Sequence, residues 1–526
     1  MNGLLKFITC GSVDDGKSTL IGHMLYDAKL LFADQARSLE LDSKVGSRGG
    51  KIDYSLLLDG LMAEREQGIT IDVAYRYFTT ERRSFIVADT PGHEEYTRNM
   101  AVGASFADLA VILVDASQGV LVQTRRHARI CSLMGIRHFV FAVNKMDLTG
   151  YDRSRFAEIA REIEGLIQEF HCDTVKIIPV SATEGDNITE PSTNMPWYHD
   201  GTLLSFLETV DVSSADSEVG FTLPVQRVSR PDRTFRGFQG QIASGQVQVG
   251  DEVTALPSME RAKVTKILNA GADVPSAAKG QAVTLQLDRE VDISRGCVMT
   301  CGSKPYLGDQ IAVRLLWMDD EPLAEGKNYL LRIGTQKKPA VISNIQYKID
   351  VNTGERIPAD TLSKNELAAC ELVVSEKIVF DLFDNSQDLG SLILIDRVSH
   401  MTSACGVVTG DLTSRSEETG EVTPALRASQ KGQQPKTVWF QSGSAEVARR
   451  VEKHLFALGR HTMTLDGNSL GWNASRLAET ARLMNQAGLI VLVASRQGCP
   501  SDDAAFVVPA RGSDPEQVVE LLENKP

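Results

Sequence analysis

The residues best suited to chemistry lie near the start of the chain, in a glycine-rich segment that ends in lysine and serine. The pattern G-x-x-x-x-G-K-[ST] is matched by Gly11-Ser-Val-Asp-Asp-Gly-Lys-Ser18, after an apolar run and before the helical segment Thr19–Tyr26. Glycines let backbone N–H groups wrap phosphates, and the helix N-terminus adds partial positive charge. We expect Lys17 to contact the β- and γ-phosphates of a nucleotide and the Ser18 hydroxyl to ligate Mg²⁺.

A second segment, Asp89-Thr-Pro-Gly-His93, follows another apolar run. An aspartate at a strand end beside the phosphate loop can hold the water shell of Mg²⁺, and Gly92 lets a backbone N–H approach the γ-phosphate. Thr70 lies where a mobile loop would close over both. The predicted metal ligands are therefore Ser18, Thr70 and Asp89, and the candidate catalytic residue, which would orient the attacking water, is His93.

A third segment, Asn144-Lys-Met-Asp147, is suited to reading a guanine base. The Asp147 carboxylate can accept two hydrogen bonds from guanine N1–H and the exocyclic amine, a donor pair that adenine lacks. Asn144 can bond the base edge, and the stem of Lys145 can cover its face. A backbone N–H from Ser181-Ala182 would reach the guanine oxygen. This pattern predicts GTP and Mg²⁺ as the bound cofactors.

Each segment alone has an ordinary structural interpretation as a turn or a helix cap. Their order, each at the end of a successive strand, favours one nucleotide site instead. The predicted GTP-binding residues are Gly11, Ser12, Val13, Asp14, Asp15, Gly16, Lys17, Ser18, Thr19, Asp89, Thr90, Pro91, Gly92, His93, Asn144, Lys145, Met146, Asp147, Ser181 and Ala182.

The elements around these segments predict an α/β domain over residues 1–212. Short, nearly unbroken apolar runs are typical of strands buried on both faces of a mostly parallel sheet. They lie at Leu5–Cys10, Phe85–Ala88, Ala110–Asp115, Phe139–Val143 and Ile177–Val180. Helical spacing recurs at Tyr54–Met62 and Phe156–Leu166.

The rest of the chain changes character twice. Short β-type runs separated by Gly, Asp and Pro predict two β-barrels, at 219–308 and 309–408, with a hairpin-like example at Ile242–Val253. Residues 409–436 hold almost no large apolar side chains and read as a flexible linker. Residues 437–526 return to α/β character, with strands at Val438–Phe440, Thr462–Leu465 and Leu489–Ala494 and helices at Ala445–Leu458 and Ala474–Ala487.

Composition excludes several classes. The 526 residues carry 55 basic and 69 acidic side chains, a net charge of −14, which argues against a protein built to coat nucleic acid or an anionic membrane. No apolar run is long enough to span a bilayer, and no signal peptide is predicted. The eight scattered cysteines favour reduced thiols over a zinc site. We therefore expect a cytoplasmic protein that binds neither membranes nor nucleic acid.

The motifs resemble those of the elongation-factor class of translational GTPases, and Arg236–Gly245 with Val249–Asp251 looks like the second-domain barrel of that class. A closer resemblance, over residues 1–408, is to the GTPase subunits of bacterial heteromeric sulfate adenylyltransferase. It rests on Asp14–Ser18, Asp59–Tyr77, Thr97–Met100, Asn194–Tyr198 and Asp292–Gly296. The resemblance implies that GTP hydrolysis drives the synthesis of adenylyl sulfate and diphosphate from ATP and sulfate on a separate small catalytic subunit, subunit 2, as partner.

The tail resembles adenylylsulfate kinase at Val438–Phe440, Gly459–His461, Leu465–Gly467 and Ala487–Val493. Where that family has its phosphate loop, this chain reads Gln441-Ser-Gly-Ser-Ala-Glu-Val447, without the Gly-Lys-Ser/Thr end. Glu446 would repel phosphates, and Asn468 stands where the family has an acidic residue. We therefore predict a kinase-like domain without kinase activity.

Two alternatives remain from the sequence. An elongation-factor-like carrier of aminoacyl-tRNA would need a basic groove and salt-dependent RNA binding. A bifunctional GTPase and adenylylsulfate kinase would need the lysine that is absent near Gly443.

Overall fold

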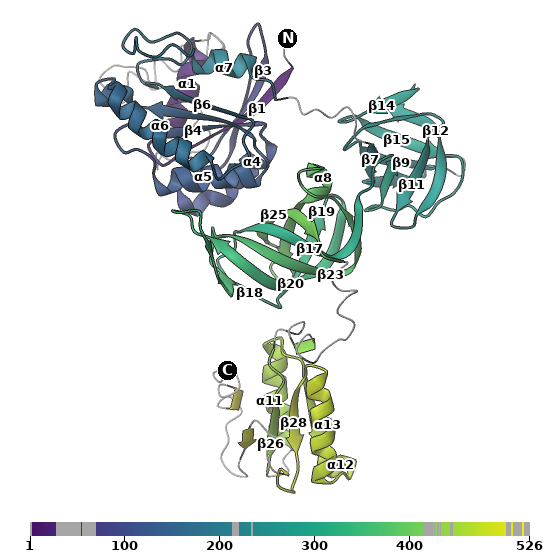
Figure 1. Cartoon of the computed structure of the whole chain (residues 1–526). Coiled ribbons are helices and arrows are strands. Elements are labelled where there is room, and N and C mark those ends of the chain that lie inside the picture. Colours follow the sequence, from purple (N-terminus) through teal and green to yellow (C-terminus); the bar gives the residue numbers. More distant parts are fainter. Residues whose placement is uncertain are drawn as a thin grey trace.

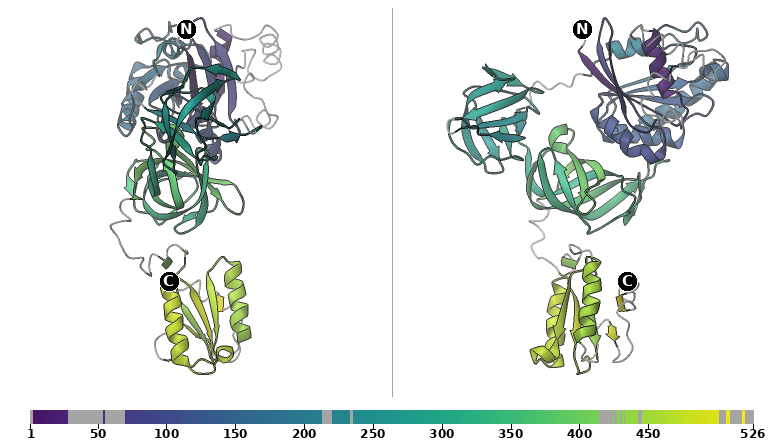
Figure 2. Two further views of the ribbon diagram at one scale, coloured as in Figure 1. Left: turned by 90° about the vertical axis from the view of Figure 1, so that its right-hand side faces the viewer. Right: turned by 180° about the vertical axis from the view of Figure 1, so that it is seen from behind.

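The computed structural model describes residues 3–27, 54, 70–212, 220–232, 235–413, 424, 427–428, 431, 433–441, 445–500, 506–508 and 518–519. Figure 1 shows four bodies in chain order, of which the third lies between the first two and the tail. The same arrangement is visible from the side and from behind in Figure 2.

The first body is a six-stranded sheet in the order β2-β3-β1-β4-β5-β6, with helices on both faces. All pairs are parallel except β2 with β3. The strands are β1 Leu4–Cys10, β2 Ala74–Thr79, β3 Ser84–Asp89, β4 Leu109–Asp115, β5 His138–Asn144 and β6 Thr174–Pro179. The helices are α1 Lys17–Asp27, η2 Glu94–Tyr96, α4 Thr97–Phe106, α5 Val122–Leu133, η3 Met146–Thr149, α6 Arg153–Ile167 and α7 Leu203–Thr209.

Burial on both faces explains the apolar runs of this sheet. Every residue of β4 is buried, and two separate apolar clusters cover its faces. Parallel strands covered by crossover helices have no solvent face, so they need no alternation of polar and apolar side chains. The five predicted strands are confirmed within a few residues, whereas the antiparallel edge strand β2 was not predicted.

The second body is an antiparallel sheet in the order β7-β16-β11-β12-β15-β9-β8, to which β13 adds through β12. A bridge between Thr222 and Ser244 brings the segment after β9 back to β7 and curves the sheet toward closure. The strands are β7 Phe221–Pro224, β8 Arg227–Ser229, β9 Gly237–Gln241, β10 Gln246–Gln248, β11 Glu252–Leu256, β12 Glu260–Asn269, β13 Ala272–Val274, β14 Ser276–Ala278, β15 Ala282–Leu287 and β16 Val298–Cys301.

The predicted hairpin at Ile242–Val253 is wrong. Strand β10 pairs with β14, and β11 pairs with β12 and β16, so the two short runs do not pair with each other. The local pairing in this region is between β11 and the following strand β12, where Ala255 lies opposite Glu260.

The third body is a closed six-stranded barrel. The order β19-β24-β25-β17-β23-β20 is completed by pairing of β20 with β19. Its elements are β17 Tyr306–Trp317, β18 Leu323–Ala324, β19 Asn328–Ile333, β20 Gln336–Ile349, β21 Arg356–Ile357, β22 Thr361–Leu362, β23 Leu367–Phe380, α8 Gln387–Gly390, β24 Ser391–Asp396 and β25 Thr402–Asp411. An α/β domain followed by antiparallel β-domains confirms the predicted fold class for this part of the chain.

The tail holds a parallel four-stranded sheet in the order β27-β28-β26-β29. Its elements are β26 Thr437–Phe440, α11 Ala445–Ala457, β27 Thr462–Asp466, α12 Gly467–Leu470, α13 Ala474–Gln486, β28 Ile490–Ala494 and β29 Phe506–Val508. The predicted strands and helices of the tail are confirmed. The short elements α12 and β29 were not predicted.

Some predictions fall outside the described residues. Among them are most of the helical spacing at Tyr54–Met62, the boundary near residue 213, the residues just before Thr70, and much of the linker at 409–436. Among the described residues, no helix is long and apolar enough to cross a membrane. All eight cysteines are free.

Candidate nucleotide site

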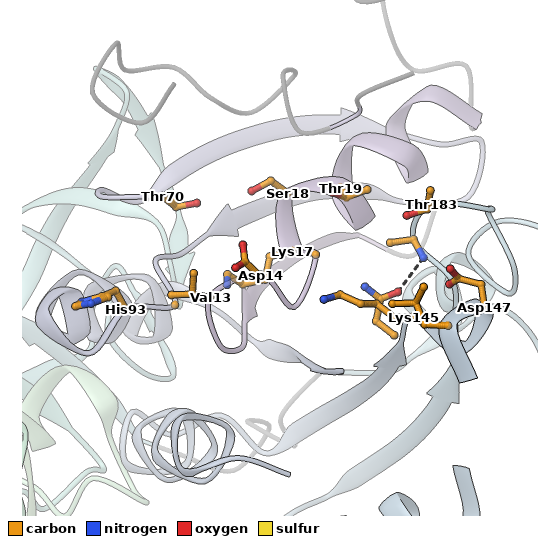
Figure 3. Close-up of a pocket in the computed structure, with 15 residues that line it drawn as sticks. Val13, Asp14, Lys17, Ser18, Thr19, Thr70, His93, Lys145, Asp147 and Thr183 are labelled. Carbon is orange, nitrogen blue, oxygen red and sulfur yellow. Dashed lines mark hydrogen bonds between the residues drawn. The ribbon is translucent and has the colours of Figure 1, made fainter. Parts of the chain in front are cut away.

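A cleft of about 540 Å³ opens at the carboxyl ends of the parallel strands, within the size range of small-molecule sites. Figure 3 shows its lining side chains converging from separate loops. They are Val13, Asp14, Gly16, Lys17, Ser18, Thr19, Thr70, Gly92, His93, Asn144, Lys145, Asp147, Leu148, Ala182 and Thr183. The structure thus brings together residues from all the predicted segments.

The remaining predicted residues lie behind this lining rather than in it. Asp89 and Thr90 are almost fully buried, and the Thr90 hydroxyl donates to Thr9 O at 2.7 Å. Met146 is buried in the apolar core. The predicted residues that are not in the lining are Gly11, Ser12, Asp15, Asp89, Thr90, Pro91, Met146 and Ser181.

The lysine of the phosphate loop is held inside the loop. Lys17 is 7% exposed, and its Nζ donates to Gly11 O at 3.2 Å and to Ser12 O at 2.7 Å. Burial lowers the pKa of Lys17, and the nearby carboxylates of Asp89 and Asp15 oppose that shift. The ammonium is therefore positioned at the loop, where phosphate oxygens can take the place of the carbonyls.

Two glycines are required by close contacts. A Cβ on Gly16, whose φ is +88°, would lie 2.6 Å from Asn144 Nδ2. A Cβ on Gly92 would lie 2.7 Å from both Gly11 O and Lys17 Nζ. Any side chain at these positions would displace the loop that surrounds the phosphate position.

Hard oxygen donors meet beside the loop. The Ser18 hydroxyl donates to Asp89 Oδ2 at 2.8 Å, and the Thr9 hydroxyl donates to Asp89 Oδ1 at 2.9 Å. Thr70 lines the same cleft. Mg²⁺ prefers a few oxygen ligands together with water and phosphate, so this donor set fits that ion. Among the described residues, no cluster of three or more His, Cys, Asp or Glu side chains forms a metal site of protein ligands alone.

His93 lies at the edge of the cleft with an exposed side chain. Its Nδ1 accepts a hydrogen bond from Glu95 N at 3.2 Å and so caps η2. This bond fixes the tautomer that carries the proton on Nε2 and leaves that second nitrogen for other contacts.

The base-reading residues form a connected network. Asn144 Nδ2 donates to Asp15 O at 2.7 Å, and Asn144 Oδ1 accepts from Ala182 N at 2.8 Å. The Ser181 hydroxyl donates to Asp147 Oδ1 at 2.7 Å, which orients the carboxylate. Because Ala182 N already bonds Asn144, its predicted contact with the guanine oxygen stays a prediction.

Sequence reasoning missed an acidic partner of this network. Asp115, at the end of β4, accepts from Lys145 Nζ at 2.7 Å and is 3% exposed. Burial favours a raised pKa for Asp115, but hydrogen bonds from Lys145 and Ser117 outweigh it and lower the pKa. An aspartate ending a predicted strand was the available signal. The lining residues Leu148 and Thr183 directly follow predicted motifs and were also missed.

The barrel of the third body touches the segment that follows His93. Asn365 Nδ2 donates to Glu94 O at 3.0 Å, and Arg98 Nη2 donates to Thr402 O at 2.8 Å. On the same helix, Asn99 Nδ2 donates to Ile71 O at 2.8 Å, next to Thr70. The segment after His93 is thus hydrogen-bonded directly to the barrel, and the segment at Thr70 is connected to the barrel through helix α4.

The loop after β26 in the tail differs from the phosphate loop. Residues 442–444 lie outside the described residues, but Glu446 is exposed in the first turn of α11. Asp466 is paired with Arg449 at 3.6 Å, and it accepts from Asn468 N at 3.1 Å to cap α12. The first turn of the helix that follows this loop thus carries a negative charge, whereas the first turn of the helix that follows the phosphate loop carries Lys17.

Comparison with known proteins gives two family matches. Residues 2–216 match the elongation factor Tu GTP binding domain, and residues 310–409 match the GTP-eEF1A C-terminal domain-like family.

Three relatives are similar over most of the chain. A bifunctional enzyme NodQ from a Rhizobium species is 48% identical over 93% of this chain and 80% of its own length. A bifunctional enzyme CysN/CysC from Xylella fastidiosa is 48% identical over 93% of this chain and 82% of its own. Sulfate adenylyltransferase subunit 1 from Shewanella oneidensis is 51% identical over 78% of this chain and 87% of its own.

Proposed function

Since the chain belongs to the family of sulfate adenylyltransferase subunit 1 and its bifunctional relatives, we propose that it drives sulfate activation by hydrolysing GTP. The reaction it drives forms adenylyl sulfate and diphosphate from ATP and sulfate. The observation that carries this proposal is a single cleft lined by Lys17, Asp147 and His93.

Guanine selection is assigned to Asp147. Its carboxylate lines the cleft and is oriented by the Ser181 hydroxyl, while Lys145 is held by Asp115 so that its stem lies beside the base position. A fixed carboxylate matches the two donors of guanine and would leave an adenine unmatched.

Ser18, Asp89 and Thr70 are the residues that would hold Mg²⁺. The ion would neutralise charge on the β- and γ-phosphates. Lys17 holds the phosphates, and His93 orients water through Nε2, because Nδ1 is occupied by Glu95 N.

The adenylation chemistry is assigned to a partner, the small catalytic subunit of sulfate adenylyltransferase. A relative named subunit 1 implies at least one further subunit. GTP hydrolysis can drive that subunit only if it binds the GTP and GDP states unequally. The contacts of Asn365 and Arg98 with the segment after His93 support a route by which the barrel follows the nucleotide state.

The tail is assigned a kinase-like fold without kinase activity, since it has no lysine in the segment Gln441–Val447 and carries Glu446 there. The division of the chain into 1–212, 219–308, 309–408, 409–436 and 437–526 remains our prediction, as does a cytoplasmic location.

The decisive experiment measures GTPase rate with and without the small catalytic subunit, in the wild type and in Asp147→Asn. We expect the subunit to stimulate the wild type, and the variant to prefer xanthosine triphosphate over GTP. An unchanged nucleotide preference would refute the role of Asp147, and tRNA binding on filters without stimulation would favour a translation factor.

A second experiment tests the tail. The purified full-length protein is incubated with ATP and adenylyl sulfate, and phosphorylated product is measured. We expect none, and clear product would establish a bifunctional enzyme.

A further inference from the structure

The phosphate loop contains a buried carboxyl group that is not among the residues lining the nucleotide cleft. Asp15, directly before Gly16, is 2% exposed. Its Oδ2 accepts a hydrogen bond from Ser12 N, while Asp15 N donates to Ser12 O at 3.4 Å. The side chain thus closes a small ring across the turn of the loop.

The same residue joins the loop to the base-reading network. The carbonyl oxygen of Asp15 accepts from Asn144 Nδ2 at 2.7 Å, and Asn144 in turn bonds Ala182 N. A change in the position of Asp15 would therefore move both the phosphate and the guanine contacts.

Charged groups face this carboxyl from three elements. Lys17 lies on α1, Asp115 ends β4, and Lys145 follows β5. Burial raises the pKa of Asp15 to about 6, although Lys17 and the Ser12 hydrogen bond oppose the shift. The carboxyl is thus mainly ionised at neutral pH, with Lys17 as the positive charge that stabilises the ionised form most.

We propose that Asp15 is a positioning residue that shapes the loop in either protonation state and takes up a proton when GTP binds. The inference rests on the proposed GTP site. Incoming phosphates add negative charge beside the carboxylate and draw Lys17 toward themselves, so the ionised form loses its compensation. The proton comes from solvent, and the neutral acid still accepts the Ser12 hydrogen bond through its carbonyl oxygen.

The sign of the pH dependence follows from proton linkage. If the nucleotide complex holds the proton more tightly than the free protein, GTP affinity is highest below about pH 6 and decreases as the pH rises toward 8. Each unit by which GTP raises the pKa changes affinity by up to about tenfold across that window.

Two variants separate charge from shape. Asp15→Asn removes the charge and keeps an acceptor for Ser12 N, so we expect GTP to bind about three- to tenfold more tightly at pH 8. Asp15→Ala removes the acceptor as well, and we expect binding about tenfold weaker than wild type at every pH. Glu164→Gln, on an exposed position of α6, is the control for loss of one negative charge in the same body.

Calorimetry on the nucleotide-free full-length protein, with Mg²⁺ and a non-hydrolysable GTP analogue, provides the readout from pH 6 to 8. Each titration is done in two buffers of different ionisation enthalpy, which counts the protons taken up. We expect the wild type and Glu164→Gln to take up more protons on binding than Asp15→Asn does. Protons that come from the nucleotide itself contribute equally in all three proteins and do not affect this difference.

The outcomes are distinct. If Asp15→Asn shows the wild-type pH profile and proton count, or binds as weakly as Asp15→Ala, the inference is wrong while the GTP site stands. If the wild type binds no guanine nucleotide at any pH, the proposed function itself fails.

Discussion

Strands β1 and β26 stand in corresponding places in two sheets of one chain. Each has parallel neighbours on both sides, and the next helix along the chain is α1 after β1 and α11 after β26. The first turn of α1 contains Lys17 and no acidic residue, whereas the first turn of α11 contains Glu446.

The difference shows that the strand–loop–helix arrangement does not make a phosphate site by itself. A helix N-terminus contributes only about half a positive charge. The loop after β1 adds a buried ammonium, close-fitting glycines and oxygen donors from neighbouring strands. The helix after β26 carries the Glu446 carboxylate in its first turn instead.

The largest effect is expected from removing the positive charge that distinguishes the two loops. Lys17→Ala should lower GTPase activity at least about 100-fold, because charge on the γ-phosphate loses its nearest cation. Lys453→Ala, on an exposed position of the tail helix α11, is the control and should leave the rate unchanged. Comparable losses in both variants would remove the distinction between the loops.

The next effect concerns two carboxylates, that of Asp15 in the phosphate loop and that of Glu446 in the first turn of α11. Because the pKa of Asp15 is raised to about 6, the folded state binds its proton more tightly than the unfolded state. The free energy of unfolding should therefore decrease as the pH rises from about 4 to about 6. The contribution is on the order of 1–3 kcal/mol.

In differential scanning calorimetry, the unfolding transition of the first body is the one that added GTP shifts to higher temperature. In nucleotide-free Asp15→Asn, this transition should not show the decrease in stability between pH 4 and pH 6. Glu446→Gln, which changes the exposed carboxylate in the first turn of α11, should melt like the wild type. A wild-type pH dependence in Asp15→Asn would contradict a buried, titrating Asp15.

A smaller effect is expected at the neighbouring strand end. Asp115→Asn removes the ion pair that holds Lys145, so the dissociation constant for GTP should rise about three- to tenfold in equilibrium binding. Asp384→Asn changes an exposed partner of Arg137 and should have no measurable effect. Equal effects of the two variants would mean that the buried pair has no special role.

The smallest effect is expected from the tail. A chain shortened after residue 413 should hydrolyse GTP within about twofold of the full-length rate, because every described residue that lines the nucleotide cleft lies in the first body. Steady-state GTPase assays check this expectation. A large loss would assign the tail a direct part in the first body's activity.

Much of this molecule was predictable from local patterns. Apolar runs followed by Gly11, Asp89 and Asn144 indicated parallel strands, and the carboxyl ends of such strands lie at one edge of a sheet. Residue type and spacing were sufficient because strands buried on both faces leave unbroken apolar runs in the sequence, and the glycine-rich loop has its own local pattern.

The tertiary structure alone decided which side chains complete the site. The pairing of Asp115 with Lys145, the contact of Asn144 with Asp15 O, and the partnership of β10 with β14 join residues that lie far apart in sequence. The raised pKa of Asp15 was likewise decided by the tertiary structure, since it depends on burial and on charges from three elements. Sequence spacing carries no measure of such distances, because they arise only when the whole sheet packs.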